Sequence, residues 1–102
     1  MKEIYLSYSS KADKKFMVKV DGKTIHFGAK GYQNYGGIGQ ERHLDEDRKE
    51  RYINRHKQRE NWTKSGINTA GFWSRWLLWN KPTIQQNITD IQHRFNVKII
   101  LV

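Results

Sequence analysis

The chain has 102 residues, 36% hydrophobic and 13% aromatic, which suffices for one modest hydrophobic core over residues 1–102 but not for an elaborate second domain. Nineteen Lys and Arg against ten Asp and Glu give a formal net charge of +9, which favours an anionic partner. Cysteine is absent, which excludes disulfides, thiol catalysis and cysteine zinc sites. We therefore expect a single domain that binds polyanions, with nucleic acid the first choice and an anionic membrane or acidic protein the second.

Two classes of protein are disfavoured by the distribution of apolar residues. The first 15 residues contain no continuous apolar run, so we expect no secretory signal peptide. Apolar runs elsewhere are far shorter than a membrane span, so we expect no transmembrane segment.

The N-terminal third predicts strands. Residues 3–8 alternate apolar and polar side chains, and residues 15–20 and 23–28 flank Asp21-Gly22, a two-residue hairpin turn. That turn sets a register in which apolar side chains oppose one another on one face of the hairpin, Val18 with Ile25 and Phe16 with Phe27.

The middle of the chain predicts a long loop and two helices. Residues 28–40 contain five glycines and show neither helical nor strand periodicity. A helix is expected from about Leu44 to Arg59, with acidic residues in its first turn. Thr69 can cap a short helix from Ala70 to about Trp79 that is apolar almost all round.

The C-terminal part predicts one more helix and a strand. Pro82 suits a helix start, and Thr83 with Gln86 forms a capping-box pattern. Residues 97–102 are β-branched and apolar, which is typical of a buried strand. The predicted fold is α+β in the order β-β-β-α-α-α-β: a small antiparallel sheet of N-terminal strand, hairpin and a C-terminal strand placed inside it, with three helices packed on one face.

Positive charge is most concentrated within the first predicted helix. Residues 41–47 hold four acids against one arginine, whereas residues 48–64 hold seven basic residues against Glu50 and Glu60. Arginines spaced three, four and four residues apart form a stripe along this helix, with Tyr52 alongside: Arg48, Arg51, Arg55 and Arg59. Guanidinium groups match phosphate oxygens bidentately, so the stripe indicates phosphate binding. The alternative is that these arginines pair with acids or merely solvate a helix face.

Aromatic residues follow the arginine stripe directly. Stacking of bases is one interpretation, with Arg75 and Lys64 supplying charge between the four tryptophans, Trp62, Trp73, Trp76 and Trp79. A small core also needs large side chains, so we expect Phe72, Trp73 and Trp76 to be buried. Trp62 and Trp79 lie near polar residues at the segment ends and are the better candidates for exposure.

A metal-dependent nuclease is a third possibility. His43, Asp45 and Asp47 are close in sequence, with His56 nine residues further on. Carboxylates at a helix start already have an electrostatic role, and no general base converges with them in the sequence. We therefore expect no metal and no cofactor.

Three stretches resemble a known family: HFGAKGY at 26–32, DEDRKERYINRHKQREN at 45–61 and GINTAGFWSRWLLWNKPTI at 66–84. Together they resemble a domain of unknown function found in small proteins of large nucleocytoplasmic DNA viruses, over most of the chain after residue 15. The resemblance implies a viral protein of the virion or the host cytoplasm, in a viral factory. It implies no activity and no catalytic residue.

The sequence thus predicts a non-enzymatic nucleic-acid-binding protein that contacts phosphates largely without sequence preference. Lysines of the hairpin, with Tyr32 and Tyr35 of the glycine-rich loop, would extend the surface. The predicted contact residues are Arg48, Lys49, Arg51, Tyr52, Arg55, His56, Arg59, Trp62 and Lys64. The first alternative is a virion structural, capsid-associated protein acting through protein–protein contacts, and the second is the small metal-dependent nuclease.

Overall fold

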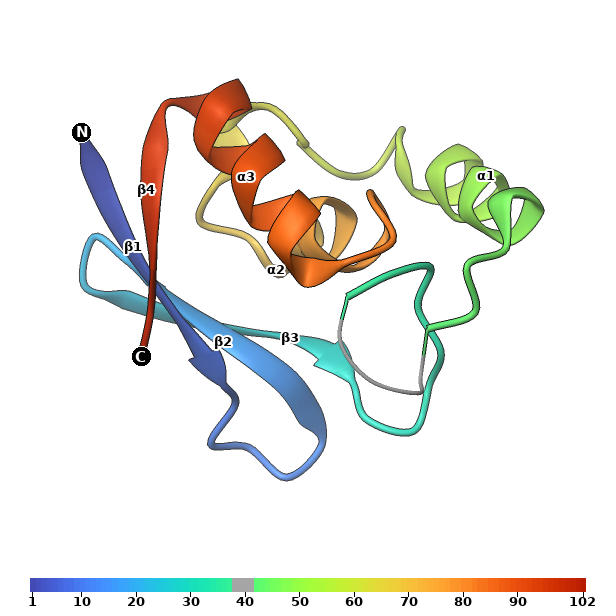
Figure 1. The fold of residues 1–102 in the computed structure, drawn as a ribbon, viewed down its shortest axis with the longest axis horizontal. Coiled ribbons are helices and arrows are strands. Elements are labelled where there is room, and N and C mark those ends of the chain that lie inside the picture. The colour runs from blue at the N-terminus through green and yellow to red at the C-terminus, as the bar shows by residue number, and fades with distance from the viewer. Residues whose placement is uncertain (38–41) are drawn as a thin grey trace.

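A computed structural model describes residues 1–37 and 42–102. Four strands form one sheet in the order β3-β2-β1-β4: β1 Lys2–Tyr8, β2 Lys14–Val20, β3 Lys23–Ala29 and β4 Val97–Leu101. Three helices and two short helical turns follow β3 (Figure 1). The element order β-β-β-α-α-α-β and the α+β class are as predicted.

The β2–β3 hairpin has the predicted turn and register. Asp21 and Gly22 both adopt positive φ angles, 50° and 80°, as a tight two-residue turn requires. Val18 pairs with Ile25, and Phe16 with Phe27, so these apolar side chains face the core together.

The C-terminal strand differs from the prediction in two respects. β4 runs parallel to β1, whereas β1 and β2 are antiparallel, so the sheet is mixed rather than antiparallel throughout. β4 also lies at the sheet edge, not inside it. A helical segment separates β4 from the other strands, so no hairpin turn determines its direction or its neighbour.

Helices cover one face of the sheet. The elements after β3 are α1 Glu46–His56, η1 Lys64–Gly66 (a 3₁₀ turn), α2 Ala70–Trp73, η2 Ser74–Leu78 (a π turn) and α3 Ile84–Phe95. In Figure 1, α2 and α3 lie over the sheet, whereas α1 lies to one side of it, beyond the end of β3. Only part of the expected helical layer therefore packs on the sheet.

The core lies between the sheet and the helical layer. Phe72, Trp73 and Trp76 are buried, as predicted, and Trp73 is fully enclosed. Their partners are the inward side chains of the strands and of α3: Ile4, Leu6, Phe16, Val18, Val20, Ile25, Phe27, Ile88, Ile91, Phe95, Val97 and Ile99. Thr83 and Gln86 form the predicted capping box of α3.

Helix α1 is shorter than predicted at both ends. Leu44 has a left-handed φ of 57°, and Asp45 is the N-cap, accepting hydrogen bonds from the amides of Asp47 and Arg48. The helix ends at His56, so Arg59 lies in the turn that follows. Asp45 is committed to capping, as Ser, Thr, Asn and Asp at this position usually are.

The predicted helix at 70–79 is split. α2 gives way to the π turn η2, closed by a bond from the Trp79 amide to the Ser74 carbonyl at 3.1 Å. This wider turn buries Trp76, Leu77 and Leu78 in succession. Periodicity alone did not predict it, because the apolar residues surround the segment.

The glycine-rich loop is irregular where it is described. Residues 30–37 contain turns and a single bridge between Asn34 and Arg42, while the predicted loop at 38–40 lies outside the described residues. Within the described part of the chain, no helix is both long enough and apolar enough to cross a membrane.

Candidate functional site

A column of aromatic rings attaches α1 to the rest of the molecule. Tyr52 is the buried residue of α1, and its ring is parallel to that of Trp79, with centroids 4.3 Å apart and an interplanar angle of 1°. The Trp62 ring lies 6.3 Å from Tyr52 at 12°, and the His56 ring 4.4 Å from it at 27°. One tyrosine thus organises contacts from several parts of the chain.

Trp62 and Trp79 are half-buried rather than exposed. Both pack against the core. Trp62 donates its indole N–H to Glu60 at 2.9 Å, and the ring centroid of Trp79 lies 5.3 Å from that of His43. Both rings already stack on Tyr52, so they are poor platforms for a nucleobase.

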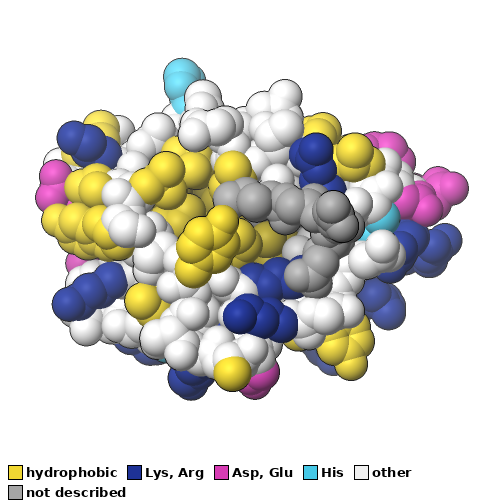
Figure 2. Space-filling model, turned by 60° about the horizontal axis from the view of Figure 1, so that its bottom comes forward, with side chains coloured by type: hydrophobic (Ala, Val, Ile, Leu, Met, Phe, Trp, Pro, Cys, Tyr) yellow, Lys and Arg dark blue, Asp and Glu magenta, His cyan; other side chains and the backbone are white. Residues whose placement is uncertain are grey.

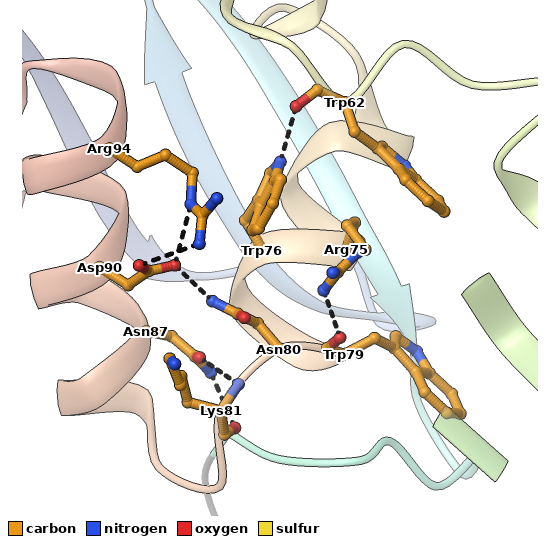
Figure 3. Close-up of polar contacts among 9 residues, drawn as sticks. All are labelled: Trp62, Arg75, Trp76, Trp79, Asn80, Lys81, Asn87, Asp90 and Arg94. Carbon is orange, nitrogen blue, oxygen red and sulfur yellow. Dashed lines mark hydrogen bonds and ion pairs between the residues drawn. The ribbon is translucent and has the colours of Figure 1, made fainter. Parts of the chain in front are cut away.

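Arg75 lies inside this aromatic region (Figure 3). Its guanidinium carbon is 4.4 Å from the ring centroid of Trp76 and 5.5 Å from that of Trp62, and one nitrogen donates to the Trp79 carbonyl at 2.7 Å. Burial lowers the pKa of the Arg75 guanidinium. Of the two cations expected between the tryptophans, the half-buried Arg75 therefore contacts three of them.

The segment after Trp79 is fastened to α3 (Figure 3). Asn87, fully buried, accepts from the Lys81 amide at 2.7 Å and donates to the Leu77 carbonyl at 2.8 Å. Asp90 accepts from Asn80 at 2.8 Å and pairs with Arg94 at 3.3 Å. These bonds fix the wall that Trp79 presents to α1.

The arginine stripe is largely unpaired. Arg51, Arg55 and Arg59 are exposed, and Arg48 is half-buried and donates to Gln33 at 2.9 Å. Among the described residues, no carboxylate pairs with any of the four. A shallow groove of ≈ 420 Å³ runs along this surface, lined by Arg48, Arg51, Asn54, Arg55 and Trp79.

A second, larger cleft separates α1 from the body of the molecule. Its volume is ≈ 620 Å³, and its walls come from α1, the open end of the β2–β3 hairpin, the loop after β3, and α2 with η2. Such a volume is within the usual range for small-molecule sites. The side chains that bring charge or hydrogen-bonding groups to it include Lys14, His26, Arg48, Tyr52, Arg55, His56, Glu60 and Ser74.

The described walls of this cleft are positively charged. Its lining includes three cationic side chains, those of Lys14, Arg48 and Arg55, and one carboxylate, that of Glu60. Glu60 accepts from the Trp62 indole and lies 3.5 Å from the His56 ring nitrogen, so it is held at one side. Burial, followed by the Glu60 charge, raises the pKa of Tyr52, which keeps its hydroxyl protonated.

Four predicted site residues therefore converge, because Arg48, Tyr52, Arg55 and His56 all line the cleft. Lys49 lies elsewhere, with its ammonium 4.7 Å from the Tyr35 ring centroid, and burial lowers its pKa. Lys64 is exposed in η1, outside α1, and is not among the residues that line the cleft.

The two loop tyrosines differ. Tyr32 is 71% exposed and lines the cleft. Tyr35 is buried and donates its hydroxyl to Glu46, so it anchors the start of α1 and does not extend the surface.

The sequence did not predict Lys14, His26 or Ser74 as site residues individually. Lys14 and His26 lie on strands 20 or more residues before α1, and no local pattern connects them to it. Only the tertiary fold places them opposite Arg48 and Arg55.

Two of the four candidate metal ligands, His43 and Asp45, are engaged otherwise. His43 accepts from the Asp45 amide at 2.9 Å, and burial lowers its pKa. Asp45 caps α1. Across residues 1–37 and 42–102, no three His, Asp or Glu side chains gather as a metal ion would require.

Charge on the surface is spread. The face drawn in Figure 2 carries Lys and Arg side chains both at its edges and within it, and its right-hand end, where α1 lies, carries carboxylates beside them. The unpaired arginines of α1 therefore concentrate positive charge locally on a molecule whose net charge is positive.

Comparison with known proteins relates the N-terminal half of the chain to one family. No curated protein and no solved structure matches the chain. A family of unknown function (DUF5754) matches residues 4–56, a segment that runs from β1 to the end of α1 and stops before Trp62. This match covers just over half of the 102 residues, and the chain belongs to that family of unknown function.

Proposed function

We propose that the protein binds nucleic acid through the exposed arginines of α1 and the turn after it, without enzymatic activity and largely without sequence preference. The observation that carries this proposal is the lack of described acidic partners for Arg51, Arg55 and Arg59, all of which are exposed. Unpaired guanidinium groups in a row attract a polyanion and bind its phosphates bidentately.

The aromatic column argues for phosphate contact over base stacking. Trp79 has its ring parallel to Tyr52, and Trp62 lies beside both Tyr52 and Arg75. Since a base needs a free aromatic face, these tryptophans position α1 and leave recognition to the arginines. We propose a viral genome or transcript as the natural partner, on the resemblance to proteins of large DNA viruses.

The test is a salt titration. Affinity for a random duplex and for a random single strand is measured at several salt concentrations with the unmodified chain and with a triple Arg51→Gln, Arg55→Gln, Arg59→Gln variant. For duplex DNA, each arginine–phosphate pair that the variant removes should lower the slope of log affinity against log salt by about one, so the triple variant should lower it by roughly two to three. Absence of binding by the unmodified chain at low salt overturns the proposal.

A second triple variant controls for net charge. Lys11, Lys81 and Lys98 are exposed and lie outside α1, and replacing all three by Gln removes the same charge. This variant should retain most of the slope. If both triple variants weaken binding equally, the arginines of α1 are no special surface.

Protein association is the second candidate function. Hydrophobic side chains gather on the left of the face in Figure 2, towards the end of the molecule that holds the termini. An apolar groove of ≈ 220 Å³ at the junction of sheet and α3 includes Tyr8 and Leu101, 69% and 59% exposed. The adjacent β4 is an edge strand, which can pair with another chain.

We propose that this groove would serve a capsid-associated role by joining two copies of the chain. Sedimentation of the protein over a range of concentrations tests this role. Self-association that the Tyr8→Ser and Leu101→Ser variants weaken, and that nuclease treatment does not change, supports it. A monomer at all concentrations contradicts it.

A further inference from the structure

The cleft between α1 and the hairpin has the chemistry of a ligand site in its own right. We infer that it binds one nucleotide unit bearing a terminal phosphate, either a free nucleoside monophosphate or the phosphorylated end of a strand. This inference deepens the proposed function, and it rests on that function for the strand-borne source of the ligand.

Cations converge on the cleft from two directions. Arg48 and Arg55 enter from α1, and Lys14 enters from β2 on the opposite side. Arg48 is fixed by its bond to Gln33, which engages one guanidinium nitrogen and leaves the others available. A phosphate between these groups would be bound from both sides. A phosphate on the outer face of α1, which presents Arg51 and, in the turn that follows, Arg59, would be bound from one side only.

Two hydroxyl groups in the cleft lack a partner among the described residues. The hydroxyl of Tyr52 makes no hydrogen bond there, although its side chain is only 7% exposed. The hydroxyl of Ser74 is likewise unpaired within the described part of the chain. Neither hydroxyl oxygen is fully enclosed, so both are accessible to an oxygen-rich ligand that enters the cleft.

The remainder of the cleft fits a sugar and a base. Its volume is ≈ 620 Å³, more than a lone phosphate needs. Tyr32 lines it with a largely exposed ring, unlike Tyr52 and Trp79, whose rings stack on each other. A base can therefore stack on Tyr32 while the phosphate lies between Lys14 and Arg55.

The experiment compares ligands that differ only in the phosphate. Isothermal titration at low salt measures affinity for adenosine 5′-monophosphate against adenosine, and for a short single strand with a 5′-phosphate against the same strand with a 5′-hydroxyl. We expect the phosphate to raise affinity about tenfold or more in at least one pair, since charge-assisted hydrogen bonds are the strong ones. Preference in the first pair identifies a free nucleotide, and preference only in the second identifies a strand end.

Variants separate the cleft from the outer face of α1. Lys14→Gln and Ser74→Ala should each reduce the preference for the phosphate, with about a tenfold reduction for Lys14→Gln, and leave duplex binding intact. Arg51→Gln with Arg59→Gln should weaken duplex binding and leave the phosphate preference intact. Neither the Lys14 nor the Ser74 side chain bonds to a described residue, so both variants should fold, which thermal unfolding verifies.

Two outcomes overturn the inference. One is equal affinity within both ligand pairs, and the other is a phosphate preference that Lys14→Gln and Ser74→Ala both leave unchanged. If the duplex still binds at low salt in either case, the cleft inference fails alone. If the duplex does not bind, the proposed function fails separately.

Discussion

The rings of Tyr52 and Trp79 stack with their planes 1° apart and their centroids 4.3 Å apart. Tyr52 is the only residue of α1 that is buried, so this contact fixes a mostly polar helix to the molecule. It also shapes both recesses beside α1, because Trp79 lines the groove and the cleft alike. The position of the arginines thus depends on a contact in which no arginine takes part.

Replacing Tyr52 by alanine should therefore destabilise the protein. Removal of a buried aromatic side chain costs about 3–5 kcal/mol, and no other side chain of α1 itself is buried. Urea unfolding measures the change in the free energy of unfolding. Tyr52→Phe is the matched control and should stay within about 1 kcal/mol, since the hydroxyl bonds to no described residue. Equal destabilisation by both variants would contradict the anchoring role of the ring.

The same tyrosine gives an alkaline limit to stability. Burial raises the pKa of Tyr52 above its ordinary value of 10.0, so the folded state resists ionisation more than the unfolded state does. The resulting stabilisation is complete below pH 10 and is lost as the pH rises further, by at most about 1.4 kcal/mol per pH unit.

Urea unfolding between about pH 8 and pH 11, for the unmodified chain and Tyr52→Phe, reveals this limit. The pH dependence should be weaker in the variant. It should not vanish, because a hydrogen bond to Glu46 also raises the pKa of Tyr35. Parallel curves for the two proteins would show that Tyr52 does not titrate in this range.

Asn87 should be the most sensitive polar residue of α3. It is fully buried and bonds to Lys81 and Leu77, which lie on the other side of the Pro82 turn. Asn87→Ala leaves an amide and a carbonyl unsatisfied, at a cost of roughly 2–4 kcal/mol in the free energy of unfolding. The exposed Gln85→Ala on the same helix should cost less than about 0.5 kcal/mol. Chemical denaturation of both variants checks the contrast, and equal stabilities would refute it.

The features of the fold that could be predicted from the sequence are those determined by residues close together in the chain. The Asp21-Gly22 turn sets the hairpin register, and Thr83 with Gln86 starts α3, because each depends on residues only a few positions apart. The direction of β4 depends on packing across the whole chain.

The same distinction holds for the candidate site: its local part could be predicted, and the part assembled by the fold could not. The arginine stripe was visible in the sequence because helical spacing is local, and its exposure follows from a polar helix. The opposite wall was not visible, since only the fold brings Lys14 and Arg55 into the lining of one cleft. The parallel stacking of Tyr52 on Trp79, 27 positions later in the chain, has no local signature either.

Two glycines with nearly the same backbone angle should respond differently to alanine. Gly22 and Gly28 have φ angles of +80° and +78°, which cost a residue with a Cβ about 1–2 kcal/mol. An added Cβ at Gly22 meets nothing within 4 Å, whereas at Gly28 it would lie 2.9 Å from a methyl carbon of Leu78, a side chain 1% exposed. Leu78 cannot move aside without disturbing the core, so Gly28→Ala should cost roughly 1–3 kcal/mol more than Gly22→Ala. Thermal unfolding of the two variants isolates this steric cost, because the backbone strain is common to both. Equal melting temperatures would mean that Leu78 in η2 moves to accommodate the added methyl group at little cost, and would contradict the steric argument.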